Sequence, residues 1–377
     1  MTGTANIGRK SLCRWRRYYL APMIKDHRGR RAGRRLLALW AAFAVALTLP
    51  VAASASTPGV SIPKDESPHN TAREWWYYTG HLDGVDSRGK RRSYGFEQVF
   101  FRNRIQYPTL EGYAANLAVT DLTGDGFKWE TRTAGQPDNL PAGGGYDIAV
   151  QDWNMAGKSG QYRLGGGFQD GSYKLALNLE QRTPPALHGE YKDVKGLIDY
   201  AQWGESFYYS YTNLKTTGTI WDHGEPIKVT GTSWFDHQYG DFTRGYGSWD
   251  WFSVQLTNGT QYMVYLIKDR TGVVRRTGTL VRKDGSTVNL PAKSLYAEAL
   301  GTWKSPVTGL SYSSGWKVHV PGGCLTIKPR RLDQEVAWED APGGGYWEGD
   351  SSVTGTIDGD SVTGRSYVEI TTPDDTF

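Results

Sequence analysis

Residues 74–101 read EWWYYTGHLDGVDSRGKRRSYGFEQVFF, which is an aromatic run, an Asp-Gly pair and a second aromatic run. Aromatic and β-branched residues favour strands, and Asp-Gly is a typical hairpin turn. Residues 249–267, WDWFSVQLTNGTQYMVYLI, repeat this arrangement around an Asn-Gly pair. The two stretches predict two β-hairpins. Their similarity indicates two related β units; the alternative is a chance similarity between aromatic hairpins.

Further alternating runs continue this pattern beyond residue 101. They lie at residues 113–121, 173–179, 207–214, 228–234, 277–281 and 316–320, and are separated mainly by Gly, Asp and Asn. Helical periodicity is scarce, and strands spaced in this way are typical of antiparallel barrels or sandwiches. The sequence therefore predicts an all-β protein.

The two hairpins also determine the predicted domain organisation. Their repeat places the seam between the β units near residues 215–227, which gives an N-terminal β domain at 71–220 and a C-terminal β domain at 221–377. Residues 56–70, STPGVSIPKDESPHN, are rich in Pro and Ser and show no periodicity. We expect them to form an extended lead-in to the first strand.

The first 55 residues resemble an export signal. Residues 36–49 are almost continuously apolar, follow an arginine cluster at 30–35, and precede the small residues VAASA at 51–55. This pattern predicts a secretory signal peptide cut after Ala55, and Arg34-Arg35 also fits a twin-arginine signal. A membrane anchor is the alternative, but the apolar run is shorter than the ~20 residues that span a bilayer. Met23 is an alternative start of the protein, and residues 1–22 would then not be part of it.

Removal of this segment reverses the net charge. The 377 residues carry 43 basic and 39 acidic side chains, a net charge of +4. Residues 1–55 hold 11 of the basic residues and one acidic residue, so 32 basic and 38 acidic residues remain, a net charge of −6. The exported chain therefore has no excess of positive charge that would indicate binding to nucleic acid or to an anionic membrane.

The aromatic stretch at 74–82 contains the first candidate for chemistry. On a strand, Glu74, Trp76 and Tyr78 point to one face, and the residues between them point to the other. A carboxylate beside large aromatic side chains is desolvated, which raises its pKa and allows it to donate a proton. The alternative is a packed strand in which Glu74 is paired with a basic residue or with backbone amides.

The second candidate is WFDHQYGDF at 234–242, which is followed by Trp249-Asp250-Trp251. An acid, an imidazole and a phenol, Asp236, His237 and Tyr239, lie within four residues. Such groups can form a relay in which one orients another and a third meets the substrate. The alternative is that Asp236 and His237 only satisfy a turn.

Several other chemistries lack their sequence signals. No Gly-x-Ser-x-Gly elbow supports a serine hydrolase, and no Walker loop or strand-to-helix Gly-x-Gly-x-x-Gly supports a nucleotide cofactor. No two histidines are spaced at i, i+2 or i+4, so the spacing predicts no dedicated metal site. We expect no cofactor and no metal.

Four motifs in order resemble one family. EWWYYTGHL at 74–82, WFDHQYGDF at 234–242, WDWFSVQLTNGTQYMVYLI at 249–267 and VTGRSYVEI at 362–370 are similar to the lipocalin-like, AttH-type proteins, which include the carotenoid 1,2-hydratases (hydroxyneurosporene synthases). The resemblance spans most of residues 70–377. It implies two lipocalin-like (calycin) antiparallel β-barrel domains packed side by side, with a pocket for a long apolar ligand near their junction.

The resemblance also implies site residues. It assigns the acid to Asp236, with Tyr239, Trp249 and Trp251 as aromatic neighbours. In this reading His237 or Tyr239 orients the acid or positions water, and the ligand is lined by the side chains Glu74, Trp76, Tyr77, Trp234, Trp249 and Trp251. The chain departs from the family at Tyr239, where Trp is common, and at residues 369–373, EITTP, where a Gly-Tyr ending is usual.

These observations lead to one leading hypothesis about function. The protein is exported, binds an apolar isoprenoid-type small molecule, and adds water to a carbon–carbon double bond by acid catalysis from Asp236, without a cofactor or a membrane anchor. The alternatives are a non-catalytic carrier of hydrophobic ligands, a cyclase or cycloaddition catalyst, and a secreted hydrolase. The sequence leaves the oligomeric state open.

Overall fold

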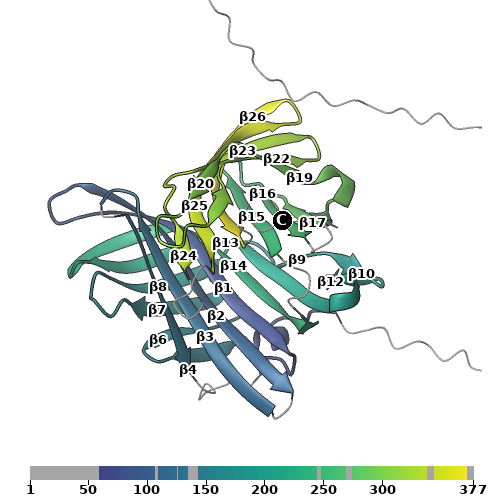
Figure 1. The fold of residues 1–377 in the computed structure, drawn as a ribbon, viewed down its shortest axis with the longest axis horizontal. Helices are drawn as coiled ribbons and strands as arrows, with labels where there is room; N and C mark the ends of the chain where they lie inside the picture. The colour runs from purple at the N-terminus through teal and green to yellow at the C-terminus, as the bar shows by residue number, and fades with distance from the viewer. Residues whose placement is uncertain are drawn as a thin grey trace, which may run out of the picture. The chain divides into compact units, whose positions relative to one another are not determined.

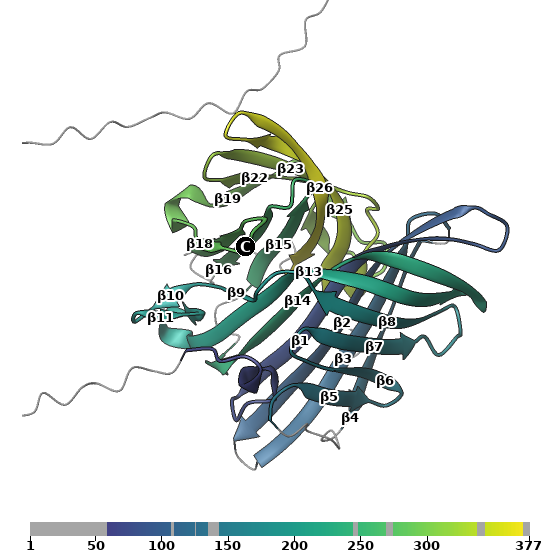
Figure 2. The same ribbon diagram turned by 180° about the vertical axis from the view of Figure 1, so that it is seen from behind.

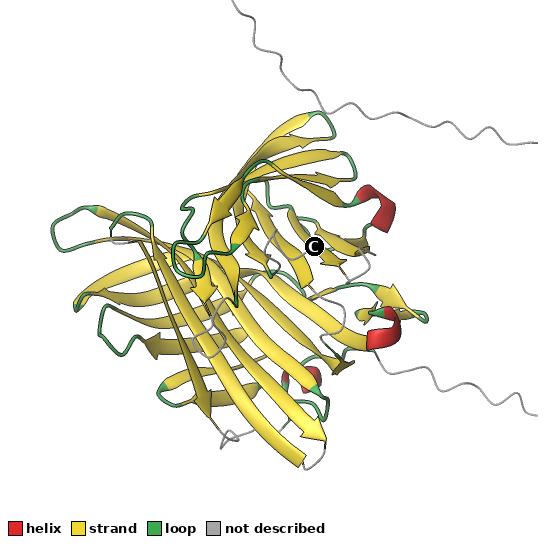
Figure 3. Ribbon diagram, viewed as in Figure 1, coloured by secondary structure: helices red, strands yellow, loops and turns green. Residues whose placement is uncertain are grey.

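The computed structural model describes residues 59–106, 109–124, 126–134, 143–243, 248–268, 274–337 and 344–371. The predicted signal peptide and its cleavage position lie outside these ranges. Strands make up most of the described chain, and its helices are short 3-10 turns at Lys64–Glu66 (η1), Ala201–Trp203 (η2) and Ala292–Ser294 (η4) (Figure 3). None of these helices has the length and apolar character needed to cross a membrane.

The first large sheet contains residues from both sides of the predicted seam. Its main path runs β4-β3-β2-β1-β14-β13-β8-β7-β6-β5, and β9 and β12 pair with β13 at its side. The strands of this half of the chain are β1 (Arg73–Val85), β2 (Arg91–Gln106), β3 (Thr109–Asp121), β4 (Gly126–Ala134), β5 (Tyr146–Val150), β6 (Trp153–Lys158), β7 (Gln161–Gly167), β8 (Tyr173–Gln181), β9 (Ala186–Leu187), β10 (Glu190–Tyr191), β11 (Val194–Lys195), β12 (Leu197–Asp199), β13 (Gly204–Asp222) and β14 (Glu225–Phe242).

The second large sheet begins after residue 247. Its path runs β18-β17-β16-β15-β26-β25-β23-β22-β19, with β24 paired to β25. The strands of this half are β15 (Ser248–Leu256), β16 (Gln261–Lys268), β17 (Val274–Val281), β18 (Thr287–Asn289), β19 (Tyr296–Ala299), β20 (Thr302–Lys304), β21 (Ser311–Ser313), β22 (Trp316–Val320), β23 (Gly323–Pro329), β24 (Glu335–Ala337), β25 (Gly345–Ile357) and β26 (Asp360–Ile370).

The two sheets share one topology. In each, the first strand pairs with the next strand and also with the last: β1 pairs with β2 and β14, and β15 pairs with β16 and β26, always antiparallel. This return of the last strand to the first is the way an up-and-down meander curls toward a barrel. The prediction of an all-β protein with two lipocalin-like units is therefore confirmed.

The chain passes from the first sheet to the second between residues 242 and 248. The repeat of the two hairpins had predicted the domain boundary between residues 220 and 221. β13 runs without a break through that position, and β14 pairs with both β13 and β1 of the first sheet. The physical reason is closure, because the last strand of a barrel returns to its first strand across a long stretch of sequence. The Asp83-Gly84 pair also lies within β1, and the turn forms further on, where the Gly89 amide donates to the Asp86 carbonyl (3.0 Å).

The described part of the lead-in, residues 59–70, packs against the first sheet, contrary to the extended segment that its composition predicted. Its 3-10 turn ends at Glu66, whose buried carboxylate accepts hydrogen bonds from the hydroxyls of Tyr162 (2.6 Å) and Tyr211 (2.8 Å). The Trp76 indole donates to the Glu66 carbonyl (3.0 Å). A buried carboxylate held by several donors fixes the segment, although its sequence shows no periodicity.

The two sheets meet through β1, β2 and β13 on one side and β15, β25 and β26 on the other (Figures 1 and 2). A buried aromatic cluster joins them, with Tyr77, Tyr208 and Trp234 from the first sheet and Trp251 from the second. Polar groups also bond across the seam: the Trp251 indole donates to the Tyr208 hydroxyl (2.9 Å), and the Tyr77 hydroxyl donates to Glu348 (2.7 Å). The sheets therefore pack directly on one another.

Candidate functional site

Strand β14 sends alternate side chains to two different places. Asp236 bonds to Tyr208 at the seam between the sheets, whereas His237 bonds to Tyr209 inside the first sheet. Tyr239 packs in the core of the first sheet with Trp76. The predicted relay of Asp236, His237 and Tyr239 is therefore not formed, because successive strand residues face opposite sides. The alternative that Asp236 and His237 satisfy a turn is also wrong, since both lie within a continuous strand.

A cavity lies at the seam, and we call it the inter-sheet cavity. Its volume is about 50 Å³, and it is partly open to solvent. Side chains from both sheets line it, among them Tyr77, Glu97, Phe101, Tyr208, Asp236, Gln238, Trp249, Trp251, Tyr265, Tyr346 and Glu369. Of the residues predicted from the sequence, five belong to the lining of this cavity: Glu74, Tyr77, Asp236, Trp249 and Trp251. Trp234 packs edge-on against Trp251, with ring centroids 6.0 Å apart.

Asp236 is a buried acid within a frame of donors. The Tyr208 hydroxyl donates to Oδ2 (2.7 Å), the Trp234 indole donates to Oδ1 (2.6 Å), and the Ser210 hydroxyl also donates to Oδ1. Burial raises the pKa of Asp236 to about 7, although the three hydrogen bonds oppose the shift. A substantial fraction of the protein therefore holds a transferable proton on Asp236 near neutral pH, and the same donors stabilise the carboxylate once the proton has left.

The frame around Asp236 extends to a histidine that the sequence did not single out. His188 is fully buried, its Nε2 bonds to Ser210 Oγ (2.6 Å), and its Nδ1 bonds to Thr279 Oγ1 of the second sheet (2.8 Å). Burial lowers the pKa of His188 to about 3, so the ring is neutral. A neutral imidazole can donate to one hydroxyl and accept from the other, so His188 orients Ser210 toward Asp236.

Three further carboxyl groups lie at this seam: Glu97, Glu348 and Glu369. Glu348 is the strand partner of Glu369 and accepts a hydrogen bond from Tyr77, and Glu97 accepts one from Tyr346 (2.9 Å). Burial raises the pKa of Glu97 to about 8 and that of Glu348 well above its usual range, and the neighbouring carboxyls add to both shifts. Two of the three acids are therefore protonated at neutral pH.

The sequence analysis missed these acids, although a signal was present. Glu97 and Glu369 lie within two of the quoted motifs as single acids in otherwise apolar runs. Such a residue costs free energy when buried unless it is paired or neutral, so it is a marker of a functional position.

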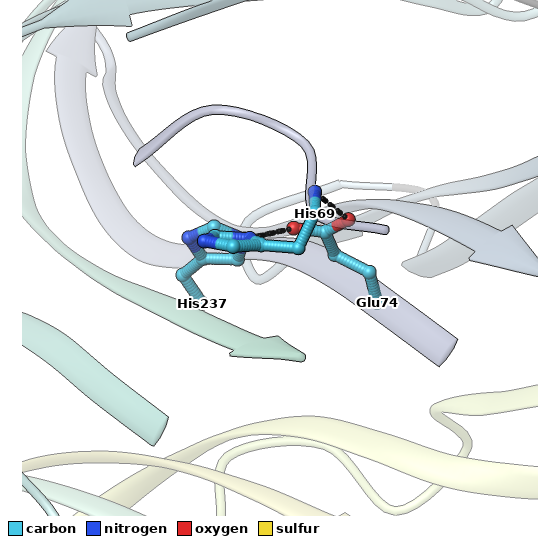
Figure 4. Close-up of side chains that lie close together, drawn as sticks. All are labelled: His69, Glu74 and His237. Carbon is cyan, nitrogen blue, oxygen red and sulfur yellow. Dashed lines mark hydrogen bonds and ion pairs between the residues drawn. The ribbon is translucent and has the colours of Figure 1, made fainter. Parts of the chain in front are cut away.

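Glu74 belongs to the lining of the cavity, but its carboxylate bonds to side chains on the other face of β1. Its Oε1 bonds to His69 Nδ1 (2.7 Å) and to His237 Nε2 (2.9 Å) (Figure 4). The Arg102 guanidinium lies 3.3 Å from its Oε2. Burial raises the pKa of Glu74, but the hydrogen bonds and charges of His237 and His69 outweigh it and lower the pKa below its usual value. The prediction of a neutral, proton-donating Glu74 is therefore wrong, and the alternative of a paired Glu74 is confirmed.

Comparison with known proteins agrees with this architecture. The AttH-like family model matches residues 53–373. The chain belongs to the AttH-like family. The family resemblance found in the motifs is thus confirmed.

Two solved structures resemble this AttH-like protein over most of its length. A candidate AttH protein from Nitrosomonas europaea is 28% identical, with a TM-score of 0.71 over 84% of this chain and 98% of the other. Kievitone hydratase from Nectria haematococca is 18% identical, with a TM-score of 0.66 over 84% of this chain and 94% of the other. At that identity, the second likeness shows the fold alone.

A curated sequence relates the AttH-like chain to a hydratase. Kievitone hydratase from Fusarium solani subsp. phaseoli is 26% identical over 182 residues, which is 45% of this chain. The match spans 50% of the length of that relative.

Proposed function

We propose that this protein is a cofactor-independent hydratase that adds water across a carbon–carbon double bond of an apolar, isoprenoid-type ligand. The double bond lies in the inter-sheet cavity, the rest of the ligand extends through its open side, and Asp236 is the acid. The observation that carries the proposal is a buried carboxyl group with a pKa of about 7, held by three donors in a cavity lined by aromatic rings. The relationship to kievitone hydratase supports the reaction class.

The geometry supports a balanced reaction. Asp236 gives its proton to one alkene carbon, and the positive charge forms on the neighbouring carbon. The faces of aromatic rings such as Trp251 stabilise that cation, and Tyr208, Ser210 and Trp234 stabilise the carboxylate that remains. Water then adds to the cation and returns one proton to Asp236, so the protein ends as it began.

Polar groups in the cavity wall can hold the attacking water. Gln238 and Glu369 line the cavity together with Asp236. Most of the other lining side chains are aromatic, which favours an apolar ligand with few polar groups. The arrangement therefore suits a hydrocarbon chain that presents one double bond to Asp236.

Mass spectrometry tests the proposal. Apolar lipid extracted with the purified protein, or a panel of short isoprenoids added to it, is compared before and after incubation. A bound species that gains the mass of one water supports a hydratase. A species that binds and leaves unchanged supports the alternative of a carrier and contradicts the catalytic proposal.

We also propose that the protein acts outside the cytoplasm after loss of its first 55 residues. The arginine cluster, the apolar run at 36–49 and VAASA at 51–55 support this. Expression in a secreting host should give a protein whose N-terminus is at or near Ser56, determined by Edman degradation. Recovery of an exported or membrane-bound chain that retains residues 36–49 would contradict cleavage.

A further inference from the structure

We propose a transition-metal site formed by His69, Glu74 and His237, on the face of β14 opposite the inter-sheet cavity. The three residues come from the lead-in, β1 and β14, and Figure 4 shows their side chains converging. His69 and His237 are separated by 168 positions in the chain, so local spacing could not reveal the pair. The site does not depend on the proposed hydratase activity, because the side chains that bond to Asp236 are Tyr208, Ser210 and Trp234 and not these three.

The three potential ligand atoms lie close together. His69 Nδ1 lies 2.7 Å and His237 Nε2 lies 2.9 Å from the same oxygen of Glu74, and all three atoms lie within 4.8 Å of one another. Metal–ligand bonds of about 2.0–2.2 Å bring ligand atoms to roughly 3 Å separations. Only small side-chain movements are therefore needed to place an ion between them.

Each ligand is oriented by a contact at its other polar atom. Glu74 Oε2 accepts the His69 backbone amide (2.8 Å) and faces Arg102, which leaves Oε1 for the ion. His237 Nδ1 bonds to the Tyr209 hydroxyl (3.0 Å), and His69 Nε2 faces Asp65 (3.6 Å). Such outer contacts fix the tautomer and orientation of metal-binding imidazoles and carboxylates.

Aromatic stacking fixes the two rings as well. His69 lies flat on Tyr239, with centroids 3.5 Å apart and planes 3° apart, and His237 stacks on Trp76 at 4.8 Å. Tyr239 stands where Trp is common in the resembling family, and here it supports His69. The ligand set is therefore held in place before an ion arrives.

The donor types select the metal. Two imidazoles and one carboxylate suit Zn²⁺, Co²⁺, Mn²⁺ or Fe²⁺, whereas Ca²⁺ and Mg²⁺ prefer oxygen ligands alone. Glu74 and His237 are fully buried, but the His69 side chain is 19% exposed and provides a path for the ion from solvent. A bound ion would join the lead-in to β1 and β14 and so stabilise the folded chain.

Binding of Co²⁺ and Zn²⁺ to EDTA-stripped protein tests the site. We expect visible absorption from one bound Co²⁺, and a rise in melting temperature of roughly 5 °C when Zn²⁺ is present at about 100 times its Kd. His69→Gln and His237→Gln should each weaken binding by at least ~100-fold. His319→Gln is the matched control, because His319 Nε2 also bonds to a carboxylate, that of Glu298 (3.0 Å), on the second sheet.

Two outcomes would overturn the site. One is the absence of Co²⁺ and Zn²⁺ binding, which would leave the three residues as a hydrogen-bonded network only. The other is binding that is equal in the unmodified protein and in His69→Gln. That variant changes a partly exposed residue of the lead-in, so it remains informative if His237→Gln does not fold.

Discussion

Replacement of Asp236 by Asn should lower turnover of the hydrated ligand by about 100-fold or more and leave ligand affinity nearly unchanged. Asn keeps the shape of the side chain. Its amide oxygen can still accept from Trp234 and its NH2 group can donate to the Tyr208 hydroxyl, but it has no acidic proton to transfer. Single-turnover kinetics and equilibrium binding of the same ligand, measured on folded protein, separate the two effects.

Trp249→Ala should affect ligand binding, in contrast to Asp236→Asn. Trp249 lines the inter-sheet cavity and does not bond to Asp236 in any contact of the described residues, so its truncation removes apolar contact area and should weaken binding. If Asp236→Asn instead lowers affinity and melting temperature together, with unchanged activity per folded molecule, then Asp236 is a structural residue and the catalytic assignment is wrong.

Stability should fall as the pH rises from about 5 to 8, and Glu97→Gln should reduce this fall. Burial raises the pKa of Glu97 from 4.5 to about 8, so between these values the folded chain holds a proton that the unfolded chain releases. This one group then lowers the unfolding free energy with each pH unit in that window, by an amount on the order of 1 kcal/mol. Below about pH 4.5 its contribution is fully present.

Denaturant unfolding at several pH values measures this slope. Gln resembles the protonated acid and does not ionise, so Glu97→Gln should be relatively more stable at pH 8 than at pH 5 when compared with the unmodified protein. Glu190→Gln, at an exposed position of β10, is the matched control and should leave the slope unchanged. An equal slope in the unmodified protein and in Glu97→Gln would show that Glu97 is ionised in the folded state.

The strands could be predicted from the sequence because a period of two is a local property. The runs at 173–179, 261–267 and 316–320 all lie within observed strands. The boundary between the sheets could not be predicted, because β14 resembles the start of a new unit until its pairing with β1 is known. Closure joins residues far apart in the chain, and no local pattern records it.

The candidate site was predictable only where its members share a motif. Asp236, Trp249 and Trp251 were singled out and do meet in one cavity. The prediction that Asp236 and His237 act together was wrong, because it relied on their proximity in the chain. The strand alternation that was used for residues 74–78 would have placed them on opposite faces. Glu348 reaches Tyr77 only through packing of the second sheet on the first, so this contact had no sequence signal.

The alternation along β14 also makes this strand unusually sensitive to a change of frame. A one-residue insertion before Trp234 would turn Asp236 toward His69 and His237 toward Trp251, and both groups of contacts would be lost at once. A two-residue insertion would restore the facing of every side chain. Substitutions at 236 and 237, in contrast, should have separable effects, since each residue acts with distant segments of the chain and not with its immediate neighbour.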